Sequence, residues 1–317
     1  MKKVLFWLAA IAILIVTQAG IKGLIGPYYY HILILVGINI ILAVSLNLIN
    51  GVTGQFSIGH AGFYAVGAYS SASLVYYGQS AIRPALSFLP QMAQDAVLLL
   101  LGLCAGALTA GIAGLAVGIP SLRLRGDYLA IVTLGFGEII RVLILNINAI
   151  GASRGFSGIP LLSNFFWVYL FVFVTIVTVY NLVHSSYGRA FISIRDDEIA
   201  AEAMGVDTTR FKVMSFVISS MFAGVAGGLF GHFEMYLHPN SFLFTTSFYL
   251  IIMIVVGGLG SIEGAIVGAT LVTVVLEVFR SFGPFRLVNF SVLLVLVMLY
   301  RPQGLVGSWT LFRKGTA

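Results

Sequence analysis

The chain has 317 residues, 59% of them hydrophobic and only 9% charged, and it carries a formal net charge of +6. Charged residues make up about a quarter of soluble globular domains, so this composition excludes that class. Together with a mean hydropathy of +1.04, it predicts an all-α fold, a polytopic transmembrane helical bundle, because unpaired backbone groups cannot face lipid.

Residue types that carry out chemistry are sparse. The basic residues stand singly at the ends of apolar runs, which indicates membrane topology rather than nucleic-acid binding. Cys104 is the single cysteine and lies in an apolar run, so no disulfide framework is expected. The histidines show no metal-ligand spacing, which disfavours an intramembrane enzyme, and no G-x-x-x-x-G-K-S/T loop for nucleotide phosphates occurs. We therefore predict no catalytic residue, metal or cofactor bound by this chain.

The N-terminal region predicts one or two helices. Residues 4–16 are apolar, follow Lys2 and Lys3, and precede a weak cleavage site at 17–19. They form either a cleaved secretory signal or, extended to Gly20, a first span. A second span is expected at 29–49, with an interfacial aromatic belt of tyrosines at 28–30.

Glycine and polar residues follow the second span. Residues 51–62 include four glycines as well as Gln55 and Ser57, yet they lie between two apolar spans. In a membrane, such irregular backbone is tolerated only where it lines a cavity. We therefore predict that Asn47, Gln55 and Ser57 contact a transported substrate.

The third and fourth spans are expected at 63–77 and 95–119, joined by an outer loop at 78–94. The fourth span carries a small residue at every fourth position, which predicts close packing of another helix along one face. These small residues are Gly102, Gly106, Ala110, Gly114 and Gly118.

A fifth span is expected at 127–147, after a short basic loop. Glu138 lies about 16 Å into it, near the bilayer midplane, and Arg141 follows one turn later on the same face. Charges at that depth are expensive and face the protein interior or a wet path. Two interpretations remain open: the pair neutralises itself and pins two helices, or Glu138 lies on the substrate pathway.

A loop at 148–163 and a sixth span at 164–183 lead to a polar island at 184–212. The island holds nine of the chain's 28 charged residues. Within it, 197–204 favours a helix, because Asp197 can cap the N-terminus and Gly205 suits the left-handed closing position. That helix is only about 12 Å long, too short to cross roughly 30 Å of hydrocarbon.

This short helix predicts a docking element outside the bilayer. Ala200, Ala203 and Met204 form a small, smooth face opposite Glu198 and Glu202. Such a face fits a groove on another protein, while the alternative is a solvated loop with no partner. The predicted coupling residues are Asp197, Glu198, Ala200, Ala201, Glu202, Ala203, Met204 and Gly205.

Four further spans complete a set of about ten, within a single permease domain at 1–317. They are expected at 213–233, 242–256, 265–279 and 287–300, and a second glycine-broken segment at 257–264 separates the middle two. The seventh repeats the small-residue pattern, and Glu277 is expected to pair with Arg280 one turn later.

The basic residues predict the orientation. With both termini cytoplasmic, eleven basic residues fall on the inner side and five at the outer edge, while Arg141 lies within a span. This bias places the polar island in the cytoplasm.

Five stretches carry a resemblance to a known family: NLINGVTGQFSIGHAG (47–62), GDYLAIVTLGFGEIIR (126–141), EIAAEAMG (198–205), VGGLGSIEG (256–264) and YRPQGLV (300–306). They resemble permeases of bacterial branched-chain amino acid ABC importers, of the LivM type. The third is similar to the EAA-type loop that couples such permeases to the ATPase. Glu263 departs from the pattern, since the family more often has an uncharged residue there.

The resemblance implies a permease subunit of an ATP-driven importer that moves leucine, isoleucine or valine across the bacterial inner membrane. It implies as partners a second homologous permease subunit, two ATP-binding subunits that use the ATP, and a periplasmic substrate-binding protein. Urea and short-amide importers have permeases of the same appearance, so that substrate class stays open. An ion-coupled carrier that needs no partner is the alternative of another class.

Overall fold

The computed structural model describes residues 18, 26–87, 89–121, 128–301 and 303–306. The expected first helix, the basic loop with Arg123 and Arg125, and the C-terminal Arg313 and Lys314 lie outside the described residues. The expected orientation of the chain, which rests partly on these basic residues, therefore stays a prediction.

Nine long helices make up most of the described chain, one for each of the nine spans expected after the first. Their bounds are α2 (Pro27–Asn47), α3 (His60–Ala85), α4 (Gln91–Ser121), α5 (Tyr128–Asn146), α6 (Phe165–Val183), α9 (Thr208–Glu234), α10 (Phe244–Gly257), α11 (Ile262–Val278) and α12 (Arg286–Tyr300). Within the described residues, the regular structure is helical apart from one pair of two-residue strands.

Six segments of the described chain are both long and apolar enough to cross a membrane: Pro27–Val52, Gln91–Ser121, Tyr128–Asn146, Phe165–Val183, Thr208–Glu234 and Ile262–Gly283. The apolar helices α10 and α12 have only 14 and 15 residues, and α3 is long but not among the six. The chain is a multi-pass membrane protein, and the expected count of about ten spans is not confirmed.

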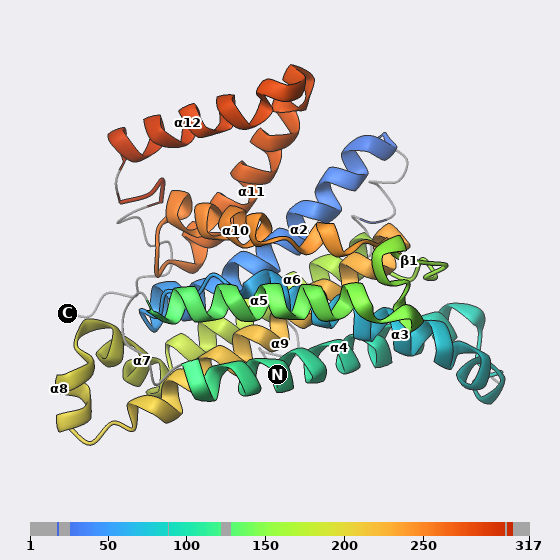
Figure 1. Cartoon of the computed structure of the whole chain (residues 1–317), viewed down its shortest axis with the longest axis horizontal. Helices are drawn as coiled ribbons and strands as arrows, with labels where there is room; N and C mark the ends of the chain where they lie inside the picture. Colours follow the sequence, from blue (N-terminus) through green and yellow to red (C-terminus); the bar gives the residue numbers. More distant parts are fainter. Residues whose placement is uncertain (1–17, 19–25, 88, 122–127, 302, 307–317) are drawn as a thin grey trace, which may run out of the picture.

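The helices α3, α4, α5 and α9 lie along the longest axis of the molecule (Figure 1). The short helices α7 (Ser186–Asp196) and α8 (Glu198–Ala203) lie at one end, at the left of the view. The strands β1 (Phe156–Ser157) and β2 (Tyr236–Leu237) pair in antiparallel register, with β1 at the opposite end. These two ends are called the α8 end and the β1 end.

Helix α2 forms the centre of the bundle. It is apolar on all sides and buried along most of its length, as expected for a helix with no polar face. It packs against α6, α9, α10 and α11. Near its middle, Asn39 donates a hydrogen bond to Thr273 Oγ1 at 2.9 Å, and at its end the chain continues as the π-helical turn η1 (Leu48–Val52).

Small residues interlock α3, α4 and α9. The sequence pattern predicted such a packing face for α4 and α9 but not for α3. A Cβ on Gly67 of α3 would fall on the backbone of Gly224 in α9. A Cβ on Gly106 of α4 would lie 2.9 Å from the carbonyl oxygen of Gly67, so the three helix backbones meet at one level. Close backbone approach of this kind replaces the hydrophobic driving force that is missing between helices in lipid.

The predicted third span and its following loop were wrong in their bounds. Helix α3 begins at His60 and continues past Tyr77 to Ala85, and α4 begins at Gln91, so the connection covers only 86–90. Pro84 is the last but one residue of this helix, so almost no helix follows the backbone donor that it lacks. Arg83 pairs with Asp95 of α4 at 3.1 Å and closes the hairpin.

Helix α7 was not predicted, although it occupies the first part of the polar island. The Ser185 hydroxyl caps it by accepting from the Tyr187 N–H at 3.2 Å. Gly188, Phe191 and Ile194, at spacings of three residues, are buried on one face, while the polar residues Ser186, Arg189, Ser193 and Arg195 are not buried. This amphipathic spacing is the signal that was available in the sequence.

The glycine interlock yields a test of stability. Gly67→Ala is expected to destabilise the chain by about 1–3 kcal/mol, because the added methyl group overpacks a backbone contact. Gly135→Ala in α5 is the matched control, since no described atom beyond the nearby backbone of its own helix lies within 4 Å of its Cβ position. It is expected to stabilise the helix by about 0.5–1 kcal/mol. Free energies of unfolding in mixed micelles measure both, and equal effects would contradict the interlock.

Candidate functional site

The first broken segment runs from 53 to 59, between η1 and α3. The Thr53 hydroxyl donates to the Leu48 carbonyl at 2.8 Å, and the Gln55 N–H donates to the Ile49 carbonyl at 3.0 Å. The Asn50 amide binds the backbone of Ser57 twice, as donor to its carbonyl and acceptor from its N–H, each at 3.2 Å. Side chains thus replace the helical hydrogen bonds that this segment lacks.

The second broken segment runs from 258 to 261, between α10 and α11. The Ser261 hydroxyl caps α11 by accepting from the Gly264 N–H at 3.0 Å. The chain after α12 returns to this point, because the N–H groups of Leu305 and Val306 donate to the carbonyls of Val256 and Gly257 at 2.8 and 3.1 Å.

Asn47 joins the two broken segments. Its side-chain oxygen accepts from the Gly260 N–H at 2.9 Å, and its nitrogen donates to the Ser261 carbonyl at 3.1 Å. Asn47 is buried, and a Cβ on Gly51 would fall on the Gly260 nitrogen, so η1, which leads into the first broken segment, touches the second. We call this contact region, 47–59 with 258–261, the glycine junction.

Helix α7 lies directly against the glycine junction. Gly54 adopts φ +73°, and a Cβ there would lie 2.7 Å from Cγ of Arg195. The Cβ position of Gly260 lies 3.6 Å from Nη1 of the same arginine. Arg195 therefore contacts one broken segment and borders the other.

Helix α8 follows α7 after one residue. Asp197 caps it by accepting from the N–H groups of Ile199 and Ala200 at 2.9 and 3.0 Å, and Gly205 follows in the left-handed conformation. The predicted helix is therefore confirmed to within one residue at each end.

One side of α8 is attached to the chain and the other is free of it. Glu198 forms an ion pair with the buried Lys212 of α9 at 2.5 Å, and Ala201 is buried. The rest of the helix is exposed and partly apolar; the exposed residues are Ile199, Ala200, Glu202, Ala203 and Met204. Of the predicted coupling residues, Ala201 alone packs fully into the chain.

Helix α5 covers the first broken segment on another side. The Ile58 N–H donates to Oγ1 of Thr133 at 3.1 Å, and a Cβ on Gly62 would lie 2.9 Å from Cα of Gly137. On the same helix, Arg141 Nε donates to Glu138 Oε2 at 2.7 Å, and both side chains are partly exposed. The expected ion pair is confirmed.

Glu138 lines a small cavity between α5, the first broken segment and α10, with Gly59, Gly62, Phe242 and Ser247. The cavity has a volume of about 10 Å³, which is room for one water molecule at most. In this conformation the cavity is too small for an amino acid.

Polar atoms of the first broken segment, and of the first residue of α3, are buried without a partner among the described residues. They are Nε2 and Oε1 of Gln55, Oγ of Ser57 and Nδ1 of His60. Most buried polar groups in proteins are hydrogen-bonded. Their concentration within six positions sets this segment apart from the surrounding bundle.

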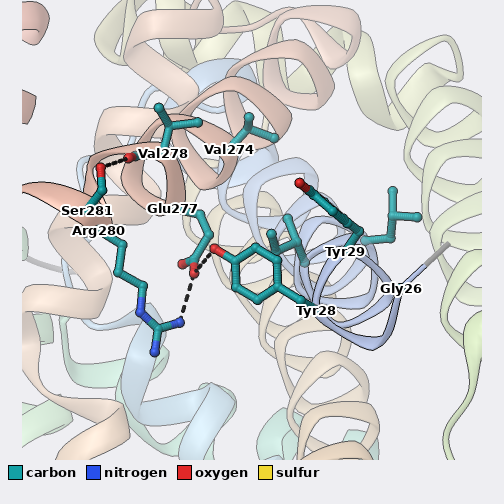
Figure 2. Close-up of a pocket in the computed structure, with 10 residues that line it drawn as sticks. Gly26, Tyr28, Tyr29, Val274, Glu277, Val278, Arg280 and Ser281 are labelled. Atoms are coloured by element: carbon teal, nitrogen blue, oxygen red, sulfur yellow. Dashed lines mark hydrogen bonds and ion pairs between the residues drawn. The ribbon is translucent and has the colours of Figure 1, made fainter.

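A separate groove of about 1020 Å³ lies between the start of α2 and the end of α11 (Figure 2). Tyr28 donates to Glu277 Oε1 at 2.8 Å, and Arg280 donates to the same oxygen at 2.9 Å, which confirms the expected Glu277–Arg280 pair. Tyr28 is roughly 28 Å along α2 from Asn47. The groove is therefore remote from the glycine junction.

The structure brings Asn47, Gln55 and Ser57 into one junction, with Glu138 at its edge, while the predicted coupling residues lie on α8. Their roles as pathway and coupling residues stay predictions. Sequence reasoning missed Arg195, because its contacts with Gly54 and Gly260 join positions far apart in the chain. Among the described residues, no three His, Cys, Asp or Glu side chains gather as a metal site.

The chain is a multi-pass helical bundle with two broken helices at one level. A short exposed helix is attached beside them. This arrangement is typical of a membrane permease. The family model described as "branched-chain amino acid transport system / permease component" matches residues 28–301. The chain belongs to this family.

Individual relatives support the same family assignment. The chain is 36% identical to the high-affinity branched-chain amino acid transport system permease protein LivM of Salmonella typhimurium and 38% identical to that of Escherichia coli. Each match covers 85% of this chain and 68% of the relative. It is also 31% identical to the permease LivH of Salmonella typhimurium, over 50% of this chain and 52% of the relative.

One solved structure, an inward-facing metal-chelate type ABC transporter, matches with a TM-score of 0.45 and 16% identity, over 93% of this chain and 96% of that chain. This likeness is too distant to bear on the present fold.

The Asn47 contact yields a second prediction. Asn47→Leu is expected to destabilise the chain by about 1–3 kcal/mol, because it leaves the partly buried Gly260 N–H and the Ser261 carbonyl without their amide partner. Asn39→Leu is the matched control on the same helix. It is expected to cost less than about 1 kcal/mol, since Thr273 keeps its hydrogen bond to the Ala269 carbonyl. Unfolding in mixed micelles measures both, and an equal or larger cost for Asn39→Leu would contradict the joining role of Asn47.

Proposed function

We propose that this chain is the membrane-spanning permease subunit of an ATP-driven importer that moves leucine, isoleucine and valine across the bacterial inner membrane. The observation that carries the proposal is the arrangement of α8. Its exposed side is free to bind another protein, and its attached side leads through α7 to the glycine junction. Membership of the branched-chain amino acid permease family supports the substrate class.

In this proposal, two ATP-binding subunits dock on α8 and hydrolyse the ATP. Ile199 and Met204 supply the exposed apolar contacts, and Ala200 and Ala203 keep the surface smooth enough to enter a groove. Glu198 and Asp197 hold the helix in place, through the ion pair with Lys212 and the N-terminal cap. The α8 end then faces the cytoplasm, and both termini lie there.

A second, homologous permease subunit covers α5 in the proposed assembly. Helix α5 is apolar and long enough to span a membrane, yet it carries the partly exposed pair Glu138 and Arg141 near its middle. Charges at that depth do not face lipid without large cost. The substrate route therefore runs between the two permease subunits, along Glu138 and the unpartnered polar atoms of Gln55 and Ser57.

The proposed transport cycle follows from this geometry. A periplasmic binding protein delivers the amino acid at the β1 end. ATP-driven closure of the ATPase subunits then displaces α8, and with it α7 and the glycine junction, so that access switches from one end to the other. A zwitterion needs few charged contacts on such a route, because the binding protein selects the ligand.

The docking role of α8 can be tested with two equally exposed methionines. Met204→Glu places a charge on the docking side and is expected to weaken binding of the ATPase subunits by about tenfold. Met92→Glu, at the start of α4, is the control, because both side chains are 84% exposed but Met92 lies far from α8. Co-purification of the ATPase subunits and leucine uptake are measured. Loss in both variants, or in neither, would contradict the docking role.

The substrate class can be tested in vesicles that contain the complete transporter. ATP-dependent uptake of labelled leucine is expected, with competition by isoleucine and valine but not by urea or acetamide. If urea or short amides were taken up in preference to leucine, the proposed substrate would be wrong and the chain would serve a urea or short-amide importer. Uptake by the purified chain alone, without ATP-binding subunits, would support the ion-coupled carrier instead.

A further inference from the structure

Arg195 lies in the last turn of α7, directly before α8, and its side chain contacts the glycine junction. We propose that Arg195 is a positioning residue that transmits displacement of α8 to the two broken segments, and so links ATP hydrolysis to opening of the route. This inference rests on the proposed function and names the residue pair through which coupling occurs.

The contact with Gly54 is tight and involves the side-chain stem. The Cβ position of Gly54 is 2.7 Å from Cγ, 3.1 Å from Cβ and 3.1 Å from Cα of Arg195. A side chain at position 54 would therefore meet both the stem and the backbone of α7. Because Gly54 also has φ +73°, its backbone is shaped to accept the arginine, and movement of α7 toward it must displace the broken segment.

The guanidinium group points to the second broken segment. Nη1 lies 3.6 Å from the Cβ position of Gly260, whose N–H is held by Asn47. Nε and Nη2 both donate to Oδ1 of Asp196, at 3.0 and 2.9 Å. This forked contact fixes the orientation of the planar group.

No flexible linker separates Arg195 from α8. Asp197 is at once the residue that ends α7 and the N-cap of α8. On the other side, Phe191 and Ile194 bury α7 in the bundle. A force on α8 therefore reaches the last turn of α7 across a single extended residue.

The stability of the fold does not explain this arrangement. The partner of Arg195 is the adjacent Asp196, and both side chains are well exposed to solvent, so the ion pair contributes little to folding. Replacement of Arg195 should leave the chain folded. A change in transport by an Arg195 variant would then reflect a change in the coupling between ATP hydrolysis and import.

The experiment uses the complete transporter in proteoliposomes and measures substrate imported per ATP hydrolysed. Arg195→Ala is expected to keep its ATPase subunits and its ATP hydrolysis, while import per ATP falls about 2- to 30-fold. Arg195→Lys keeps the stem against Gly54 and is expected to recover part of the loss. The matched control is Arg210→Ala, which removes an exposed arginine of the same polar island that lies at the start of α9, and it should leave the ratio unchanged.

A double-variant cycle tests the contact itself. Gly54→Ala should lower the same ratio, because the added methyl group would lie 2.7 Å from Cγ of Arg195 and would displace α7. Arg195→Ala removes that Cγ atom, so the combined loss should be smaller than the sum of the two single losses. An unchanged ratio in Arg195→Ala, fully additive losses, or loss of the ATPase subunits from Arg195→Ala would overturn the inference. Failure of the wild-type chain to bind ATPase subunits would instead overturn the proposed function, so the two failures are distinct.

Discussion

The amide of Asn47 is the contact on which the rest of the site depends. A membrane bundle can break a helix only where other groups satisfy the freed backbone, and this chain breaks two helices at the same level. Asn47 binds the backbone of Gly260 and Ser261, while Gly51 permits the close approach of Gly260. The two breaks therefore form one connected unit.

This unit lies between two groups of helices that are held together in different ways. Helix α2 is linked to α11 and its preceding loop by polar contacts along its length, at Tyr28, Asn39 and Asn47. Helices α3, α4 and α9 are interlocked through glycine. The first broken segment connects one group to the other, since it leaves α2 and enters α3. With α7 against it, the junction is placed to relay movement of α8 to both groups.

Much of this architecture follows from local signals in the sequence. The apolar runs predicted the helices, Asp197 and Gly205 predicted the ends of α8, and the small residues of α4 predicted its packing face. Other features depend on contacts between distant positions. The hydrogen bond between Asn47 and Gly260 joins residues 213 positions apart in the sequence. No local sequence pattern predicts this bond, and none predicts the contact of Arg195 with Gly54. Arg83 and Pro84 resembled a loop, because the partner of Arg83, Asp95, lies on the next helix and no local pattern indicates that pair.

The most direct test of this account is a distance measurement between spin labels in the complete transporter. Cys104, the chain's single cysteine, is first replaced by serine. Labels on Ala200 of α8 and Leu259 of the second broken segment occupy exposed sites. The account predicts that their separation stays constant between nucleotide-free and ATP-trapped states, while the distance from Ala200 to a label on the exposed Leu108 of α4 changes. The account would be contradicted if the distance from Ala200 to Leu259 changed with nucleotide while the distance from Ala200 to Leu108 stayed constant.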